Sequence, residues 1–454
     1  MPSLEVPARF IEDAFNVCEP EQPLRDADDP RYYDLSVARG DQSLSKLRRR
    51  FELKTARSPE PYLKLAFVSH RGAGKTTELL RLGQTLAPRY RWFYFEANTQ
   101  LDPLHLEVED LLLALVLAIE EEARTVWGKP LSRDLLARVE AWFQEQLRTT
   151  SWQETLSGEV GGAVEAKGEV PFLASVRANL KALLQSESKY RTEIRDAFRR
   201  TPRGLVDARG SAARAAGGAV LNAANEVLKA QRQELVVVID NLDRYPERVV
   251  DGLLIQRVNQ LEMLRCHLVV TPPVSMYYRP VSTSLESHYD VEVMQTVRLR
   301  GRDEPYTTLS GSGPEALLAA LGKRMVLDEL IPDPAARDAL VRGSGGAIRE
   351  LLSLVREAIL NTPKGTTIPA AAVHKALQKL RRTFRDRINA NGWAPTLARI
   401  SRDKQIHDGP AVQDALFRRL AFSYNGGGWY GVHPLVTELD EFVAARRTLD
   451  DAPA

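Results

Sequence analysis

The chain has 454 residues, and the usual size of a domain divides that length into about three. Hydrophobic residues make up 44% and charged residues 27%, a composition typical of globular proteins. The 62 basic residues nearly balance the 60 acidic ones, so the overall charge favours neither nucleic acid nor membrane as a partner. Cys18 and Cys266 are the two cysteines, which excludes a disulfide framework or a cysteine-rich zinc module and indicates a reducing, cytoplasmic compartment.

The sequence carries no pattern for export or membrane insertion. Residues 1–20 lack a basic region followed by an apolar run, so we expect no secretory signal. The most apolar predicted helix, 106–123, contains several glutamates and is too short to cross a bilayer. We therefore expect no membrane partner.

The first predicted elements are an extension and then an α/β core. Residues 1–60 contain acidic, proline-punctuated turns and a charged helix, which predict an N-terminal helical extension. Apolar and aromatic runs predict about five strands, at 62–69, 89–98, 234–244, 266–273 and 293–301. Their alternation with helices predicts an α/β fold with a parallel sheet across residues 61–310.

A long interruption separates the second predicted strand from the third. Residues from about 125 to 230 are mostly helical in pattern. The exception is "SGEVGGAVEAKGEVPF", 157–172, which predicts either a flexible linker or a β-hairpin. The sequence does not indicate what this insertion does.

Beyond the sheet, the pattern becomes helical. Residues 311–380 predict an all-α lid whose helices have proline or glycine at their borders. In 381–454, a helix precedes two aromatic strands around Asn425 to Gly428, which is a hairpin signature. Helices followed by one hairpin predict a small winged-helix-like domain.

The stretch "SHRGAGKTT", 69–77, predicts a phosphate-binding loop between a strand and a helix. Backbone amides of such a loop, with the N-terminus of the helix, surround phosphate oxygens. Lys75 would reach the β and γ phosphates, and the Thr76 hydroxyl would bind magnesium. Ser69 stands where the usual pattern has glycine, so an ordinary turn capping a helix is the alternative. The predicted nucleotide-binding residues are His70, Arg71, Gly72, Ala73, Gly74, Lys75, Thr76 and Thr77.

A second motif, "VVVIDNLDR", supplies the acid that such a site needs at the end of a neighbouring strand. Asp240 would hold magnesium there, together with Thr76. The two motifs resemble the Walker A and Walker B motifs of the AAA+ and STAND superclass of P-loop ATPases, in particular its KAP-like and archaeal initiator-like branches. The resemblance implies ATP and Mg²⁺ as cofactors, and a P-loop core followed by a helical lid and a winged helix.

The resemblance also implies roles for residues around the phosphates. Asn241 stands where many AAA+ enzymes have a catalytic glutamate, and an amide cannot act as a general base. Asp243 would polarise the attacking water instead, unless it only pairs with Arg244. Thr271 corresponds to the sensor-1 position and Arg349, in "GSGGAIREL", to the sensor-2 arginine of the lid. A plain strand-end threonine and a solvated arginine are the alternatives.

Other residues invite weaker assignments. An arginine finger would come from a neighbouring subunit, and the candidates are Arg244, Arg279, Arg298 and Arg300. His70 and His433 have no second histidine or cysteine at ligand spacing, so structural roles are favoured over metal binding.

The sequence is compatible with three functions. The first is a slowly hydrolysing ATP switch that governs self-assembly or an effector partner, as the resemblance implies for bacterial defence systems. The second is a DNA-binding initiator-like ATPase, since the C-terminal part is locally basic at Arg399, Arg402, Lys404, Arg418 and Arg419. The third is a P-loop protein that binds nucleotide without hydrolysing it. Trp429 and Tyr430 are expected in the core of the hairpin.

Overall fold

The computed structural model describes most of the chain outside the long insertion. The described residues are 6–26, 28–40, 42–54, 62–100, 108–128, 228, 233–278, 285–363, 367–406, 409–424 and 428–451. The predicted linker or hairpin at 157–172 and the finger candidate Arg279 lie outside them, as does nearly all of the insertion at 125–230.

A five-stranded parallel sheet forms the centre of the molecule, with the strand order β2-β3-β4-β1-β5. The strands are β1 (Lys64–Ser69), β2 (Tyr90–Glu96), β3 (Glu234–Asp240), β4 (His267–Val270) and β5 (Asp290–Met294). One strand, β4, therefore lies between the strand that enters the phosphate loop and the strand that ends at Asp240. The predicted fold class, an α/β protein with a P-loop NTPase core, is confirmed.

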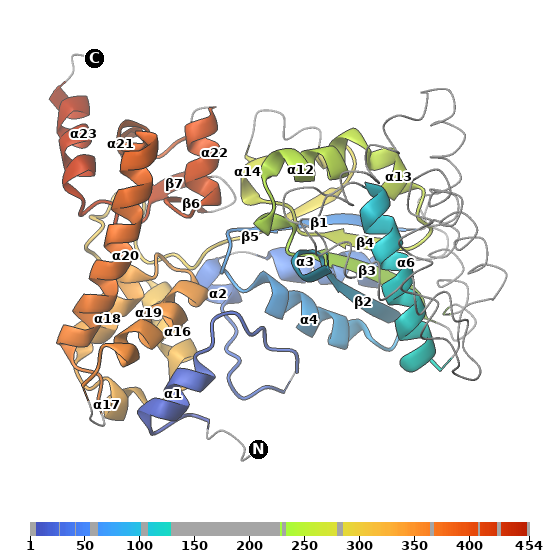
Figure 1. Cartoon of the computed structure of the whole chain (residues 1–454), viewed down its shortest axis with the longest axis horizontal. Helices are drawn as coiled ribbons and strands as arrows, with labels where there is room; N and C mark the ends of the chain where they lie inside the picture. The colour runs from blue at the N-terminus through green and yellow to red at the C-terminus, as the bar shows by residue number, and fades with distance from the viewer. Residues whose placement is uncertain are drawn as a thin grey trace, which may run out of the picture.

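Helices cover both faces of this sheet, which explains why its three central strands, β1, β3 and β4, are almost continuously apolar. Val236 and Val238 pack on one face with leucines of α3 (Ser43–Leu53) and α4 (Lys75–Leu86). Val237 and Ile239 point to the opposite face, where they share a core with α6 (Val108–Thr125). Figure 1 shows α3 and α4 on one side of the sheet, and α12, α13 and α14 on the other.

The short elements that follow β2, β3 and β4 complete the sheet region. They are α5 (Ala97–Gln100), η1 (Leu242–Arg244), α12 (Glu247–Asp251), η2 (Gly252–Gln256), α13 (Val258–Glu262) and α14 (Val274–Tyr277).

The position of the fifth strand was predicted wrongly. The sequence favoured 293–301, whereas β5 pairs with β1 from Asp290 to Met294. Charged residues in "DVEVM" obscure this edge strand, and Arg50 of α3 pairs with both of its carboxylates. Val297 and Leu299 alternate like strand residues because they pack into the core shared with the C-terminal helices.

The C-terminal region is helical and ends in one hairpin and a last helix (Figure 1). Its elements are α16 (Ser312–Gly322), α17 (Leu327–Leu330), α18 (Pro334–Gly343), α19 (Ile348–Leu360), α20 (Ala370–Asn391), α21 (Ala394–Asp403), α22 (Pro410–Phe417), β6 (Ala421–Tyr424), β7 (Trp429–Val432) and α23 (Asp440–Asp451). The helix α20 runs through residue 380, where the lid and the winged-helix-like domain were predicted to meet. That division of the chain stays a prediction.

The two strands of the C-terminal hairpin are buried in the protein. Its strands β6 and β7 are antiparallel, with Tyr424 opposite Trp429. Trp429 and Tyr430 are buried, as the sequence predicted. The turn residues 425–427 lie outside the described part of the chain.

The N-terminal region packs against the C-terminal helices. It forms α1 (Ile11–Val17) and α2 (Ser36–Arg39), and α1 lies against α19. Ala8 is joined through its backbone to Arg324 and Val326 by hydrogen bonds of 2.8 and 2.9 Å. The segment between α1 and α2 consequently runs past the end of the sheet from which the phosphate loop emerges. Among the described residues, no helix is both long and apolar enough to span a membrane.

Candidate nucleotide-binding site

The predicted phosphate loop connects β1 to α4, and two of its glycines have conformations that other residues rarely adopt. Gly72 has φ 84° and Gly74 has φ 102°, in the left-handed region. A Cβ at Gly72 would lie 2.9 Å from the Cβ of Arg349, and one at Gly74 would lie 3.2 Å from a guanidinium nitrogen of Arg39. The loop therefore needs glycine at both positions, for its backbone and for the close approach of its neighbours.

Asp240 lies at the end of β3 and collects three hydroxyl groups. Thr76 donates to its Oδ2 at 2.6 Å and Thr271 to its Oδ1 at 2.8 Å, and the Tyr94 hydroxyl also donates to Oδ2. Burial by itself would raise the pKa of Asp240. The charge of Lys75 and the three hydrogen bonds outweigh burial and lower this pKa, so the carboxylate is ionised at neutral pH.

Lys75 forms an ion pair with Asp243. Its Nζ donates to Oδ2 of Asp243 at 2.6 Å, and both side chains are buried. Asn241 has φ 65° and turns the chain after β3, so that the short helix η1 brings Asp243 back toward the phosphate loop. The predicted alternative, a pair between Asp243 and Arg244, does not form, because Arg244 pairs with Glu21 instead.

Arg349 lies in α19, part of the predicted lid, and connects this helix to the predicted phosphate loop. Its backbone N–H donates to the carbonyl oxygen of Gly72 at 3.1 Å. Its Nε donates to the carbonyl oxygen of Pro20 at 3.3 Å and lies 3.6 Å from Oε1 of Glu21. Burial lowers the pKa of Arg349, and 24% of its side chain is exposed. Arg349 is therefore not the solvated arginine of the alternative interpretation.

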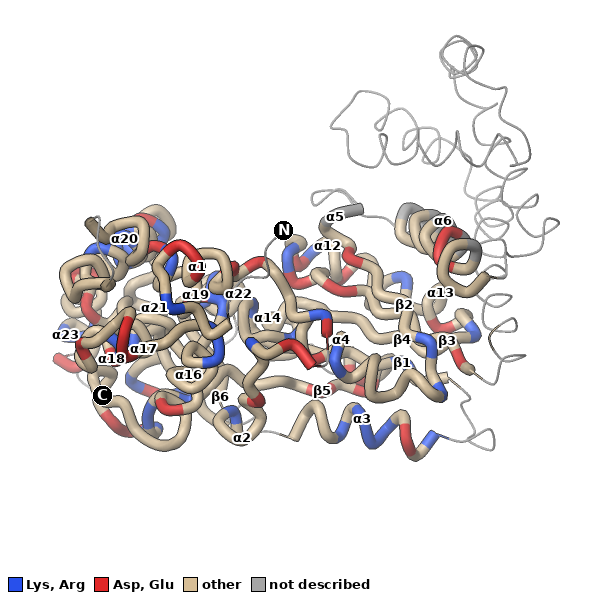
Figure 2. The backbone as a smooth tube through the Cα atoms, turned by 90° about the horizontal axis from the view of Figure 1, so that it is seen from below, with Lys and Arg blue, Asp and Glu red and all other residues tan. Residues whose placement is uncertain are grey.

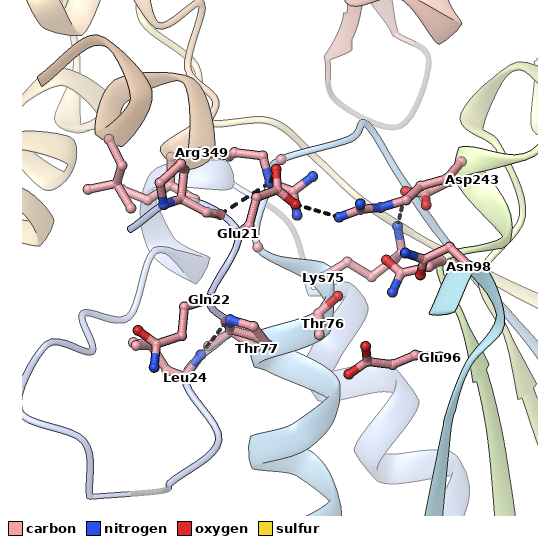
Figure 3. Close-up of a pocket in the computed structure, with 18 of the residues that line it drawn as sticks. Glu21, Gln22, Leu24, Lys75, Thr76, Thr77, Glu96, Asn98, Asp243 and Arg349 are labelled. Atoms are coloured by element: carbon pink, nitrogen blue, oxygen red, sulfur yellow. Dashed lines mark hydrogen bonds and ion pairs between the residues drawn. The ribbon is translucent and has the colours of Figure 1, made fainter. Parts of the chain in front are cut away.

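Lys75, Thr76, Asp243 and Arg349 line a pocket of about 240 Å³ at the carboxyl edge of the sheet. Figure 3 shows Lys75, Thr76, Asp243 and Arg349 around it, with the segment from Glu21 to Leu24 along one side. Its lining comprises Pro20, Glu21, Gln22, Pro23, Leu24, Gly72, Gly74, Lys75, Thr76, Thr77, Glu96, Asn98, Asn241, Asp243, Arg244, Arg324, Ile348, Arg349 and Leu352. Drug-sized ligands usually occupy pockets of about 300–1,000 Å³, so the volume of this pocket is small by comparison. Residues 20–24 of the N-terminal region form one of its walls.

Not all predicted residues line the pocket. His70, Arg71 and Ala73 of the loop are absent from its lining, as are Asp240 and Thr271, which lie buried behind Thr76. Arg71 instead lies over the ring of Phe417 at 5.8 Å. The Ala73 carbonyl accepts a hydrogen bond of 2.7 Å from Arg39.

His70 contacts the C-terminal hairpin. Its Nε2 accepts a hydrogen bond of 3.0 Å from the backbone N–H of Ser423, and its ring packs edge-on against Phe422. Burial lowers the pKa of His70 to about 3, so the ring is neutral. His433 is also buried, 4.6 Å from the ring of Phe384, and burial lowers its pKa to about 3. Both histidines have structural contacts, and among the described residues no three or more His, Cys, Asp or Glu side chains are grouped so that they could hold a metal ion.

Of the described finger candidates, only Arg244 lines the pocket. Arg298 is exposed, and Arg300 lies 3.8 Å from the centre of the Tyr306 ring.

Glu21 and Glu96 also line the pocket, although the sequence did not predict either of them as a site residue. Glu96 ends β2 directly beside Asp240, with Arg25 at 2.8 Å from its carboxylate. An acid at the end of a strand next to β3 was a usable signal for it. Nothing local marked Glu21, because its partners lie far along the chain.

The residues present fit a magnesium nucleotide. A hydroxyl and an ionised carboxylate, 2.6 Å apart, are hard oxygen ligands of the kind that Mg²⁺ prefers. The glycine loop leaves no room for a Cβ, and a buried ammonium faces the pocket beside the start of α4. Thr76 and Asp240 would hold the metal ion, and the loop and Lys75 the phosphates.

Comparisons with known proteins add little to this geometry. No family model matches the sequence, and no curated protein matches it either. One similar solved structure is Cdc6p from Pyrobaculum aerophilum, with 10% identity, a TM-score of 0.37 and coverage of 96% of this chain and 98% of that one. Another is the Aeropyrum pernix Orc1 protein in complex with DNA, with 12% identity, a TM-score of 0.38 and coverage of 95% and 97%. Such distant likenesses assign no function to this chain.

Proposed function

We propose that this protein is an ATP-binding, slowly hydrolysing P-loop ATPase of the AAA+ and STAND kind, acting as a molecular switch. One observation carries the proposal. Lys75, Thr76, Asp243 and Arg349 converge on one pocket at the carboxyl edge of a parallel sheet, where open α/β folds bind their ligands. Asp240, which does not line the pocket, accepts a hydrogen bond from the Thr76 hydroxyl.

The bound magnesium nucleotide would supply the phosphoanhydride bond and the charge that neutralises its oxygens. Thr76 and Asp240 would hold the metal ion, and hydrogen bonds from Thr271 and Tyr94 orient the Asp240 carboxylate. Lys75 would leave Asp243 to contact the phosphates. The released carboxylate of Asp243 would then be available to accept the proton of the attacking water.

Slow turnover follows from the side chains at the end of β3. Asn241 has no carboxylate, and Asp243 becomes available only after its pair with Lys75 breaks. A second carboxylate, that of Glu96, also lines the pocket. Its pairing with Arg25 restrains it from acting as a base.

Two contacts connect the phosphate loop to the C-terminal region, which supports a switch. The backbone N–H of Arg349 in α19 donates a hydrogen bond to the carbonyl oxygen of Gly72. The backbone N–H of Ser423 in β6 donates one to Nε2 of His70. A change in the loop on nucleotide binding would thus act on the lid helix and on the hairpin together. The output is self-assembly or engagement of an effector protein, as in defence-type switches.

The DNA-binding alternative ranks second. Several basic residues of the C-terminal region have acidic neighbours: Arg402 lies 2.7 Å from Asp403, and Arg419 lies 2.6 Å from Glu350. Basic and acidic positions are interspersed along the C-terminal helices in Figure 2. Such pairs weaken the field available for phosphate contacts.

The test is ATP binding and hydrolysis by the purified protein, with Mg²⁺ and with or without duplex DNA, while light scattering follows particle size. The variants are Lys75→Ala and, as a control, Lys46→Ala on the exposed side of α3. ATP-dependent assembly without DNA, lost in Lys75→Ala only, supports the switch. Assembly or turnover that requires DNA favours the initiator-like alternative, and failure of the folded wild type to bind ATP contradicts both.

A further inference from the structure

The N-terminal segment beside the pocket is held in place by ion pairs to the helix α19 on one side and to the strand β2 on the other. We call residues 19–25 the N-terminal strap. Glu19 pairs with Arg356 of α19, and Arg25 pairs with Glu96 at the end of β2. Leu24 donates its backbone N–H to the hydroxyl of Thr77 at 3.3 Å. The strap thereby bridges α19 and the sheet along one side of the pocket.

Glu21 is the strap residue whose carboxylate lies between two arginines of the pocket wall. Its Oε2 accepts a hydrogen bond of 2.7 Å from Arg244, and its Oε1 lies 3.6 Å from Nε of Arg349. Figure 3 shows Glu21 next to Arg349, on the side of the pocket where Lys75 meets Asp243. One carboxylate therefore neutralises two cations that come from different parts of the fold.

Both arginines are attached to groups that would surround the terminal phosphate. Arg244 directly follows Asp243, which pairs with Lys75. Arg349 is bonded through its backbone to Gly72 of the phosphate loop. Burial works to raise the pKa of Glu21, but Arg349 and Arg244 outweigh it and hold this pKa below its usual value. Glu21 is consequently an anion at neutral pH, as a phosphate group would be.

We propose that Glu21 determines how the pocket distinguishes nucleoside triphosphates from diphosphates, by holding Arg244 and Arg349 until a terminal phosphate displaces it. The inference rests on the proposed nucleotide-binding function and specifies the regulation of that site. A diphosphate, which ends one phosphate earlier, leaves both pairs of Glu21 intact. A triphosphate must break them before the arginines can contact it, so Glu21 disfavours the triphosphate selectively.

A purely mechanical role for the strap makes a different prediction. If Glu21 only keeps the strap closed, its loss should change the affinities for triphosphate and diphosphate by the same factor. Glu19 is the matched control, because it belongs to the same strap and also pairs with an arginine of α19. Neither Glu19 nor Arg356 lines the pocket.

The experiment is calorimetric titration of the full chain with Mg²⁺ and either ADP or the non-hydrolysable triphosphate AMP-PNP. In Glu21→Gln, AMP-PNP should bind about three- to tenfold more tightly, as expected for two partly exposed ion pairs, while ADP binding stays within about twofold. Glu19→Gln should leave the ratio of the two affinities unchanged. Adding Arg349→Ala to Glu21→Gln should remove most of the gain, because the freed arginine carries it.

The outcomes separate this inference from the function on which it rests. Equal changes for both nucleotides, or weaker AMP-PNP binding in Glu21→Gln, overturn the role of Glu21 and leave nucleotide binding intact. If folded wild type and folded Glu19→Gln bind neither nucleotide, the proposed function itself fails. Folding of each variant is checked by its thermal unfolding transition.

Discussion

The ammonium of Lys75 lies 2.6 Å from the carboxylate of Asp243, although 168 positions separate the two residues in the chain. The pair joins the phosphate loop to the segment that follows the acidic strand β3. Both side chains are buried, so removal of either one would leave the other in the interior without its ion-pair partner. In the proposed mechanism, binding of a phosphate by Lys75 would therefore release Asp243.

This pairing predicts coupled effects on stability. Lys75→Ala leaves the Asp243 carboxylate buried without its partner and should lower the free energy of unfolding by about 3–5 kcal/mol. The double variant Lys75→Ala/Asp243→Asn removes the stranded charge and should recover much of that loss. Urea denaturation of the wild type, both single variants and the double variant measures the coupling. Additive losses would show that the two side chains do not interact in solution.

Asp243 and Glu96 should differ in their effects on hydrolysis. Asp243→Asn should retain ATP binding and reduce turnover by at least about tenfold, because it removes the proposed proton acceptor. Glu96→Gln should reduce turnover less, since Glu96 is held by Arg25. Single-turnover measurements with bound ATP compare the two. A larger loss in Glu96→Gln would transfer the role of base to the end of β2.

Asp240 should govern the magnesium dependence of binding. Asp240→Asn keeps the size of the side chain but removes the charge that Thr76, Thr271 and Tyr94 stabilise. We expect the variant to bind ATP equally well with and without Mg²⁺, whereas wild type binds more tightly with the metal ion. Calorimetric titration in magnesium and in EDTA measures the difference, and an unchanged magnesium effect would exclude Asp240 from the metal site.

Gly72→Ala should damage the site through backbone strain and contact with the lid. A methyl group there meets the Cβ of Arg349 at 2.9 Å, and φ 84° is unfavourable for alanine. Strain of this kind costs about 1–3 kcal/mol, and nucleotide binding should weaken with it. Gly252→Ala is the control, because a Cβ at Gly252 meets nothing within 4 Å. Equal stabilities of the two variants would contradict the close approach of α19 to the loop.

The buried histidines predict a stability that falls in mild acid. Burial lowers the pKa of His70 and of His433 to about 3, below the unfolded value of about 6.5. Between these pH values the unfolded state binds more protons, so stability is complete above pH about 6.5 and decreases as the pH falls toward 3. His70→Gln keeps an acceptor for Ser423 but cannot titrate. Its free energy of unfolding should therefore fall less between pH 7 and 5 than that of wild type, by urea denaturation at each pH.

Local patterns were enough to locate the two sequence segments that meet at the candidate site. The loop at 69–77 and the run ending at Asp240 were recognisable because a buried strand, a glycine turn and a helix follow one another in the sequence. That these two segments face each other follows from their places at the carboxyl ends of parallel strands. The contacts of Thr271 and Arg349 with Asp240 and Gly72 depend on the same geometry.

Contacts between distant segments could not be predicted in this way. Glu21 lies 223 positions from Arg244, and Pro20 lies 329 positions from Arg349. No periodicity or motif connects such residues, because packing of the N-terminal segment between lid and sheet alone brings them together. The misplaced fifth strand has a related cause, since the alternation at Val297 and Leu299 reflects packing against helices rather than strand pairing.

Binding of magnesium ATP in the pocket formed by Lys75, Thr76 and Arg349 can be tested by calorimetric titration. Wild type, Lys75→Ala and Lys46→Ala are titrated with ATP and Mg²⁺, using only preparations that show a cooperative unfolding transition. We expect one site per chain in wild type and Lys46→Ala, and a loss of at least about tenfold in affinity, about 1.4 kcal/mol, in Lys75→Ala. Equal affinity in all three proteins, or no binding by wild type, would contradict this expectation.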